Sequence, residues 1–264
     1  MEENMFWSNS PSSLALHTIS ERSEVQMVIR ESERQSVPVE VDVFGPFAGF
    51  SRPENSIERI TYDVPTPSAC RNILNRIYLK PSEFYYQIRS IEVMNPIRII
   101  QIRRNEVKNR ISSRHPVPIY VEDCHTPRMT TYLRNVYYRI HADMILRPDH
   151  PVSVTTAGVF AQFRNRVEKG KCFAPPFLGY SECTAYFAPP DPGKTPIQES
   201  RDLGLMLYDI FDPRDNVPLD TKLGKGSMCI SYFYARLENG VVSVPPYESE
   251  EILKSEKISA WAHG

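Results

Sequence analysis

The chain has 264 residues, with 31 Lys and Arg against 32 Asp and Glu, which gives a formal net charge of −1. This length suits one large domain or two small ones with a common core, and the charge argues against a histone-like or polybasic tail protein. The 23 prolines against 11 glycines disfavour a bundle of long helices, since a proline inside a helix costs about 3 kcal/mol. We therefore expect strands joined by rigid loops.

The sequence has no features of membrane, secreted or metal proteins. No apolar stretch approaches the roughly 18 to 20 residues of a membrane span, and Glu2 and Glu3 stand where a secretory signal would carry Lys or Arg. The five cysteines contain no C-x-x-C pair, which favours reduced thiols over disulfides or zinc. Without a Gly-rich phosphate loop or clustered metal ligands, we expect no cofactor and no metal. A cytoplasmic location without a membrane partner is the prediction.

Residues 1–36 mix Ser, Glu, Asn and Arg with isolated apolar residues, which is typical of a poorly ordered arm. Regular structure is expected from Val37, where valines alternate with polar residues or proline in the period of a half-buried strand. This strand should end at residues 44–46.

The first helix has clear start and stop signals. Thr66 suits the N-cap, Pro67 suits the first helical position, and Pro81 should stop the helix. The pattern that follows predicts strands, one of which has an irregular step in its alternation between Leu133 and Val136. The predicted strands cover residues 84–94, 97–102, 117–121 and 133–144.

A second helix is expected after a cap at Thr155 or Thr156 and should be closed by Gly170. A returning strand at 181–187 would complete the order strand, helix, strands, helix, strand. This order is typical of an α+β fold, the ferredoxin-like arrangement also used by RNA-recognition-motif domains. We expect this domain at residues 37–190.

An antiparallel β subdomain is predicted at residues 191–247. Its strands are expected at 203–211 and 228–237, and Asn239-Gly240 should turn the chain into a further strand at 241–244. Residues 248–264 have the composition of a solvated, frayed tail.

The near-zero net charge conceals a separation of charges along the chain. Segment 98–114 has six basic residues against one acidic, segment 164–171 has four against one, and segment 182–220 has eight acidic against three basic. Such a basic segment is often only a solvated surface. Here Arg103 and Arg104 follow a strand and are expected near tyrosines, and arginines with aromatic rings supply the phosphate pairing and base stacking of single-stranded RNA binding. The tyrosines in question are Tyr78, Tyr85 and Tyr86, and at least one of the last two should be buried.

Ten short blocks in collinear order resemble one protein family, the CRISPR-associated Dvulg-type Cas protein five of subtype I-C. Any single block is a weak signal, but the ordered set between about residues 39 and 245 is highly specific. The blocks are 41–48 (VDVFGPFA), 50–54 (FSRPE), 61–69 (TYDVPTPSA), 77–81 (IYLKP), 95–107 (NPIRIIQIRRNEV), 133–136 (LRNV), 169–173 (KGKCF), 177–182 (FLGYSE), 202–206 (DLGLM) and 237–241 (LENGV).

This resemblance implies a protein of the RAMP superfamily with an RNA-recognition-like fold and a small C-terminal sheet. It further implies an antiviral-defence endoribonuclease that processes pre-crRNA by cutting its repeat hairpin without metal. Such a protein would then hold the 5′ handle inside a type I-C Cascade, with the backbone and large subunits as neighbours.

Metal-free RNA cleavage needs a base for the 2′-hydroxyl, cationic donors for the phosphorane and an acid for the 5′-oxygen. In the family a tyrosine at the end of the first helix serves with an adjacent Lys-His pair at the start of the second. Tyr78 matches the tyrosine, although a core aromatic is the alternative interpretation. The pair falls on Gly158 and Val159, whose side chains transfer no proton.

Three histidines are candidate substitutes for the missing pair. His150 is the one we assign to the catalytic site with Tyr78, while His141 and His125 precede it in the same region. For each, a surface or structural histidine is the competing interpretation. His141 is out of phase with the apolar residues of its strand and should point to the opposite face.

Two hypotheses therefore follow, an endoribonuclease with a rearranged site or a non-catalytic subunit that caps the crRNA 5′ handle cut by another nuclease. A third, an α+β interaction protein without RNA, would require the ordered blocks to be accidental. For RNA binding we select basic residues in or beside the matched blocks, each of which has a solvated surface charge as its alternative. They are Arg52, Lys80, Arg103, Arg104, Lys169 and Lys171.

Overall fold

A computed structural model of the chain describes residues 36–54, 58–107, 120–210 and 230–255. Apart from Ser36, the elements below belong to one compact unit that begins at Val37. The expected N-terminal arm otherwise lies outside the described residues. The elements in chain order are β1 (Ser36–Ala48), α2 (Pro67–Ile77), β2 (Phe84–Val93), β3 (Ile99–Val107), α3 (Val121–Cys124), β4 (His125–Leu146), α4 (Thr156–Glu168), β5 (Tyr186–Ala188), β6 (Arg201–Asp209), β7 (Ile230–Glu238), β8 (Val241–Ser243) and β9 (Leu253–Ser255).

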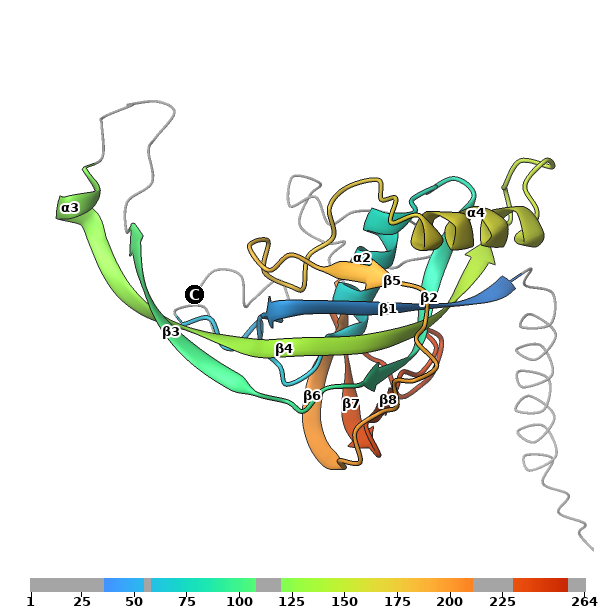
Figure 1. Ribbon diagram of the computed structural model, residues 1–264. Helices are drawn as coiled ribbons and strands as arrows, with labels where there is room; N and C mark the ends of the chain where they lie inside the picture. The colour runs from blue at the N-terminus through green and yellow to red at the C-terminus, as the bar shows by residue number, and fades with distance from the viewer. Residues whose placement is uncertain (1–35, 55–57, 108–119, 211–229, 256–264) are drawn as a thin grey trace, which may run out of the picture. The chain divides into compact units, whose positions relative to one another are not determined.

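A largely antiparallel sheet organises the fold. Its hydrogen-bonded order is β5-β1-β4-β2-β8-β7-β6, with β3 paired to β4 and β9 paired to β7. Helices α2 and α4 pack against each other and on one side of this sheet (Figure 1). The α+β class is therefore confirmed.

Strand β4 is long enough to serve two partners. Its N-terminal half pairs with β3, and its C-terminal half pairs with β2, as Figure 1 shows. Between the halves, Asn135 has a φ of +53°, a left-handed conformation that asparagine tolerates better than most residues. This residue produces the irregular step that the sequence predicts between Leu133 and Val136, both of which are buried.

The ends of both helices follow the sequence signals. Thr66 accepts a hydrogen bond from the Ala69 N–H at 3.2 Å, with Pro67 as the next residue. Thr155 accepts one from the Gly158 N–H at 3.1 Å. These capped N-termini fix where α2 and α4 begin relative to the sheet.

The hairpin signal at Asn239-Gly240 is also confirmed. Both residues have positive φ, +48° and +79°, as the favoured two-residue hairpin turns require. A Cβ on Gly240 would lie 2.3 Å from the carbonyl oxygen of Ile197. Only glycine therefore fits this turn as it is packed.

Several predicted boundaries are wrong. Val121 begins the short helix α3 instead of ending a strand, while residues 117–119 lie outside the described residues. The strand predicted at 181–187 is reduced to β5, because the chain makes turns and a single bridge before Tyr186. The tail is not frayed throughout, since β9 pairs with β7 and Ile252 is buried.

No helix among the described residues is long and apolar enough to cross a membrane. The four cysteines within those residues are free thiols, two of them buried, namely Cys70 and Cys183.

Candidate functional site

Tyr78 is the residue immediately after α2, at the helix C-cap. Its side chain is buried, with 2% exposure, and its ring lies 5.1 Å from that of Phe84 at the start of β2. The Tyr86 hydroxyl donates a hydrogen bond to the Tyr78 carbonyl at 2.9 Å. The end of α2 is thereby fixed on β2.

One face of α4 supplies the polar contacts of the Tyr78 ring. The Tyr78 hydroxyl donates to Oε1 of Gln162 at 2.9 Å. The Arg166 guanidinium lies 5.2 Å from the centroid of the same ring and donates to the Ile77 carbonyl at 3.3 Å. Gln162 and Arg166 are four residues apart and therefore share a face of the helix. Neither residue was predicted from the sequence, although their position beside the buried stripe of Val159, Phe163 and Val167 was a usable signal.

The turn between α2 and β2 adds two charged side chains, Lys80 and Glu83. Nζ of Lys80 lies 2.9 Å from the Glu83 carboxylate, and this hydrogen bond raises the pKa of Lys80. Burial, followed by the nearby Glu83 carboxylate, raises the pKa of Tyr78. Both groups therefore hold their protons at neutral pH, so they are suited to donating protons and stabilising anionic oxygens. We name Tyr78, Lys80, Glu83, Gln162 and Arg166 the Tyr78 cluster.

Gly158 and Val159, which stand where the family's Lys-His pair is expected, lie in different environments. Val159 is buried in the core, with 3% exposure. Gly158 lies four residues before Gln162, on the face that carries the Tyr78 contacts, and an added Cβ would meet only Oγ1 of Thr155, at 3.2 Å. The backbone at Gly158 therefore has room for a side chain that the sequence does not provide.

None of the three candidate histidines is joined to Tyr78 by a hydrogen bond or ion pair among the described residues. Nδ1 of His150 lies 2.6 Å from the carbonyl oxygen of Arg147, in the turn after β4. Arg147 in turn donates to the Pro81 carbonyl at 2.5 Å. Arg147 therefore connects His150 to the turn at residues 80–83. His125 contacts the Glu122 carbonyl at 3.0 Å, at the opposite end of β4. The assignment of His150 remains a prediction.

His141 points away from the core, as the alternation of its strand predicts. Its Nε2 lies 3.0 Å from the Glu92 carboxylate, and its Nδ1 lies 3.7 Å from that of Glu40. Its neighbours Ile140 and Ala142 are buried. His141 therefore belongs to the other face of the sheet from the Tyr78 cluster.

The basic residues of β3 are not near the three tyrosines, contrary to expectation. Arg104 lies opposite Arg128 in the β3–β4 pairing, whereas Tyr86 lies opposite Met144, sixteen residues further along β4. The Arg104 guanidinium instead contacts Tyr132 at 2.8 Å and Glu182 at 2.5 Å. Three other basic residues of the predicted segment lie outside the described residues, namely Lys108, Arg110 and Arg114.

The six selected cations differ in whether they are paired. Arg52 lies 3.6 Å from Glu54 and 4.4 Å from the centroid of the Tyr62 ring, while Lys80 and Arg104 are paired as above. Arg103, Lys169 and Lys171 are exposed, and within the described residues they make no ion pair. At least one of the two β2 tyrosines, Tyr85 and Tyr86, was expected to be buried. Tyr86 is in the core, with 1% exposure.

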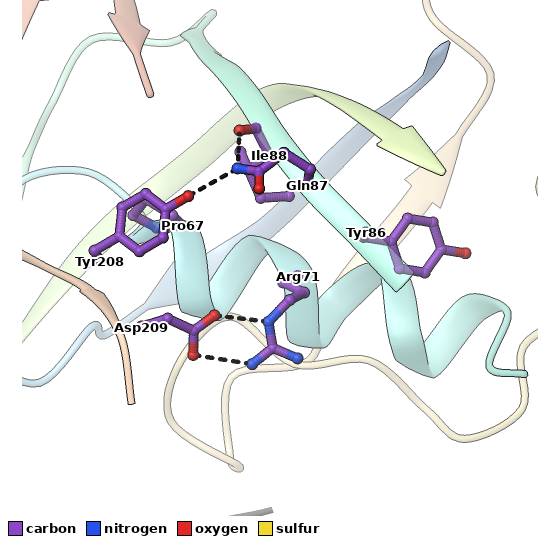
Figure 2. A pocket seen from close by; sticks show the side chains of 7 residues that line it. All are labelled: Pro67, Arg71, Tyr86, Gln87, Ile88, Tyr208 and Asp209. Atoms are coloured by element: carbon purple, nitrogen blue, oxygen red, sulfur yellow. Dashed lines mark hydrogen bonds and ion pairs between the residues drawn. The ribbon is translucent and has the colours of Figure 1, made fainter. Parts of the chain in front are cut away.

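A narrow pocket lies close to the Tyr78 cluster but has a different character. Its lining includes Arg71 of α2 and Asp209 of β6, which form two hydrogen bonds of 2.7 and 3.1 Å across it (Figure 2). The Gln87 side chain donates to the Tyr208 hydroxyl at 2.7 Å beside them. Each of these polar groups has a hydrogen-bond partner in the pocket. The Arg71–Asp209 pair holds α2 against the C-terminal strand β6. Among the described residues no cluster of His, Cys, Asp and Glu could hold a metal ion.

The chain matches the CRISPR-associated protein family Cas_Cas5 over residues 39–245. It is 37% identical over 227 residues to the CRISPR pre-crRNA endoribonuclease Cas5d of Thermus thermophilus, covering 83% of this chain and 96% of that protein. It is 35% identical over 232 residues to the protein of the same name from Mannheimia succiniciproducens, covering 81% and 97%. A crystal structure of a CRISPR-associated protein superposes with a TM-score of 0.59 at 21% identity, covering 84% of this chain and 99% of that one. This last similarity concerns the fold.

Proposed function

Because the chain belongs to the Cas5d family of CRISPR-associated proteins, we propose that it is the CRISPR RNA subunit of a type I-C Cascade, which cuts pre-crRNA and then holds the 5′ handle. Two curated relatives that match it over most of their length are named pre-crRNA endoribonucleases. The observation that carries the catalytic part is the hydrogen-bonded Tyr78 cluster, in which a tyrosine, a lysine and an arginine meet between α2, β2 and α4.

The strand order supports the ferredoxin-like, RAMP form of this proposal. Read without β3 and the short helix α3, the chain has the order β1-α2-β2-β4-α4-β5, and its strands lie in the order β5-β1-β4-β2, which is the arrangement of the split βαβ fold. In this proposal residues 37–190 are the RAMP domain and 191–247 the C-terminal β subdomain, joined through the β2–β8 pairing. The cytoplasm is the proposed location, in agreement with the free buried thiols.

In the proposed reaction the chain's cationic groups act on the phosphate. Arg166 and Lys80 stabilise the negative charge of the phosphorane, and the Tyr78 hydroxyl leaves its hydrogen bond to Gln162 and donates its proton to the departing 5′-oxygen. The base for the 2′-hydroxyl is the incomplete part of this assignment. His150 is the histidine proposed for it, since its turn contacts the Pro81 carbonyl through Arg147.

The second candidate function is a non-catalytic cap on the crRNA 5′ handle. One observation favours it, namely that Gly158 and Val159 stand where the family's Lys-His pair is expected and Val159 is buried. Handle binding requires phosphate contacts but no proton transfer, so it would be unaffected by this change.

One assay separates the two functions. The purified protein is incubated in EDTA with its own repeat RNA, and we expect a single cut at the base of the hairpin that leaves a 2′,3′-cyclic phosphate. Tyr78→Phe should lower the single-turnover rate by roughly 10²- to 10⁴-fold, the range for a general acid or base.

Tyr234→Phe is the matched control, because Tyr234 is 73% exposed on β7 and outside the Tyr78 cluster. Tight binding without cleavage would reject the nuclease and support the cap. A protein that binds no repeat RNA would reject both and support an interaction protein.

A further inference from the structure

An exposed phenylalanine follows α4 on a backbone that is firmly held. The Phe173 side chain is 70% exposed. Its N–H donates to the Arg76 carbonyl at 2.7 Å, the next N–H, of Ala174, donates to the same oxygen at 3.1 Å, and the Lys171 N–H donates to the Arg166 carbonyl at 2.8 Å. The loop is therefore fixed in place while its largest apolar group is left in water.

The same two attachments place this loop beside the Tyr78 cluster. Arg76 lies two residues before Tyr78 at the end of α2, and Arg166 holds its guanidinium 5.2 Å from the Tyr78 ring. Gly170, with a φ of +61°, turns the chain out of α4 to reach Arg76. RNA bound at the Tyr78 cluster would therefore lie near the Phe173 loop.

The charge around Phe173 suits a polyanion. Lys169 and Lys171 are exposed on the same loop, and within the described part of the chain neither has an ion-pair partner. The Arg76 guanidinium lies 4.3 Å from the Phe177 ring centroid and donates to the Pro175 carbonyl at 3.0 Å, which adds a fixed positive charge next to the loop. An exposed ring between free cations provides both interactions that hold single-stranded nucleic acid, stacking and phosphate pairing.

We propose that Phe173 is a stacking platform for an unpaired nucleobase of the bound RNA, next to the nucleotide at Tyr78, with Lys169 and Lys171 on the flanking phosphates. This inference rests on the proposed RNA-binding function and adds to it a base contact. Stacking on a ring tolerates any base, so Phe173 would position the RNA strand without reading its sequence.

The test combines affinity, salt dependence and a local probe. Repeat RNA carrying 2-aminopurine at one position at a time around the cut site is titrated with the wild-type protein. At the position that stacks on Phe173, binding should change the 2-aminopurine fluorescence, and Phe173→Ala should abolish that change. Phe173→Ala should also weaken binding about tenfold, within the range for one base–aromatic stack, while Phe173→Trp should restore it.

The salt dependence distinguishes stacking from charge. Phe173→Ala should leave the slope of log K against log salt unchanged, because it removes no phosphate contact, whereas Lys171→Ala should reduce the slope by about one. Tyr234→Ala is the matched control, since it removes an equally exposed aromatic ring from β7. It should change neither quantity.

Each remaining outcome has a definite interpretation. Unchanged affinity and fluorescence in Phe173→Ala would overturn the base contact while leaving the proposed function intact. Normal RNA binding with failure to assemble with the other Cascade subunits would also overturn it, and would assign Phe173 to a protein interface. Absence of RNA binding by the wild-type protein would instead reject the proposed function itself.

Discussion

At the scale of single residues, the ion pairs distinguish cations that the sequence treats as equivalent. Arg103 and Arg104 are adjacent in one matched block, but alternate side chains of a strand point to opposite faces. The Arg104 guanidinium is bound by Glu182 and Tyr132, whereas Arg103 is exposed and makes no ion pair within the described residues. Of these two arginines, Arg103 can therefore bind a phosphate without giving up an acidic partner among the described residues, whereas Arg104 must first leave Glu182.

We expect this difference to appear in RNA binding. Arg103→Ala should weaken binding and lower the salt slope by about one, while Arg104→Ala should have a smaller effect on both, because its charge is already balanced by Glu182. Filter-binding or anisotropy titrations between about 50 and 200 mM salt measure both quantities. Equal effects of the two substitutions would show that RNA displaces Glu182.

At the scale of elements, the sequence correctly predicts the features that depend on neighbouring residues, namely helix caps and turns. The caps at Thr66 and Thr155, the turn at Asn239-Gly240 and the irregular step near Asn135 all depend on side chains next to the backbone they shape, and all are found. Strand ends were less accurate because pairing decides them, as with β9, which exists only through its bonds to β7.

The candidate site was predicted only in part, for the same reason. Tyr78 stands in a recognisable block, so the sequence identifies it. Its partners Gln162 and Arg166 lie 84 and 88 positions further along the chain, and α4 brings them to the ring by packing on α2. No local sequence pattern predicts that these two residues contact Tyr78, although their spacing of four places them on the same face of α4.

The contact between α2 and β6 depends on one buried ion pair. Arg71 and Asp209 have side-chain exposures of 6% and 4%, and removing one member of such a pair typically costs about 3 to 5 kcal/mol, because the other charge remains buried. Arg71→Met should therefore lower the free energy of unfolding by about that amount in urea denaturation. Arg89→Met is the control, since the Arg89–Asp143 pair is 43% exposed at the arginine and such surface pairs are worth about 1 kcal/mol or less. Similar small losses in both variants would contradict the prediction.

At the scale of the whole molecule, a neutral total charge is combined with local separation of charge. Acidic residues pair with several of the cations, as Asp42 does with Arg139 at 2.6 Å and Glu106 with Arg59 at 3.3 Å. The cations left without acidic partners on the described surface include those of the Phe173 loop and Arg103. The net charge of −1 is therefore compatible with a local RNA-binding surface.

Tyrosines with a raised pKa should limit the stability of the molecule at alkaline pH. Burial raises the pKa of Tyr62 to about 12, and burial together with the Asp42 carboxylate raises that of Tyr137 to about 12, against about 10 in an unfolded chain. The unfolded chain then loses protons first, so the contribution is fully present below pH 10 and is lost as the pH rises toward 12.

Urea unfolding at a series of pH values from 8 to 11.5 measures this loss. Tyr62→Phe should flatten the decline above pH 10, although it also removes the acceptor for the Leu207 N–H and so lowers stability at pH 8 by about 1 kcal/mol. A decline as steep as that of the wild type would contradict the role of Tyr62.

The left-handed Asn135 has a consequence for the whole β3–β4 ribbon. Asn135 lies where β4 passes from its pairing with β3 to its pairing with β2, so its conformation sets how the ribbon that carries Arg103 continues from the rest of the sheet. A β-branched residue is strained at positive φ, whereas glycine is not. Asn135→Val should therefore disturb the ribbon, and Asn135→Gly should preserve it.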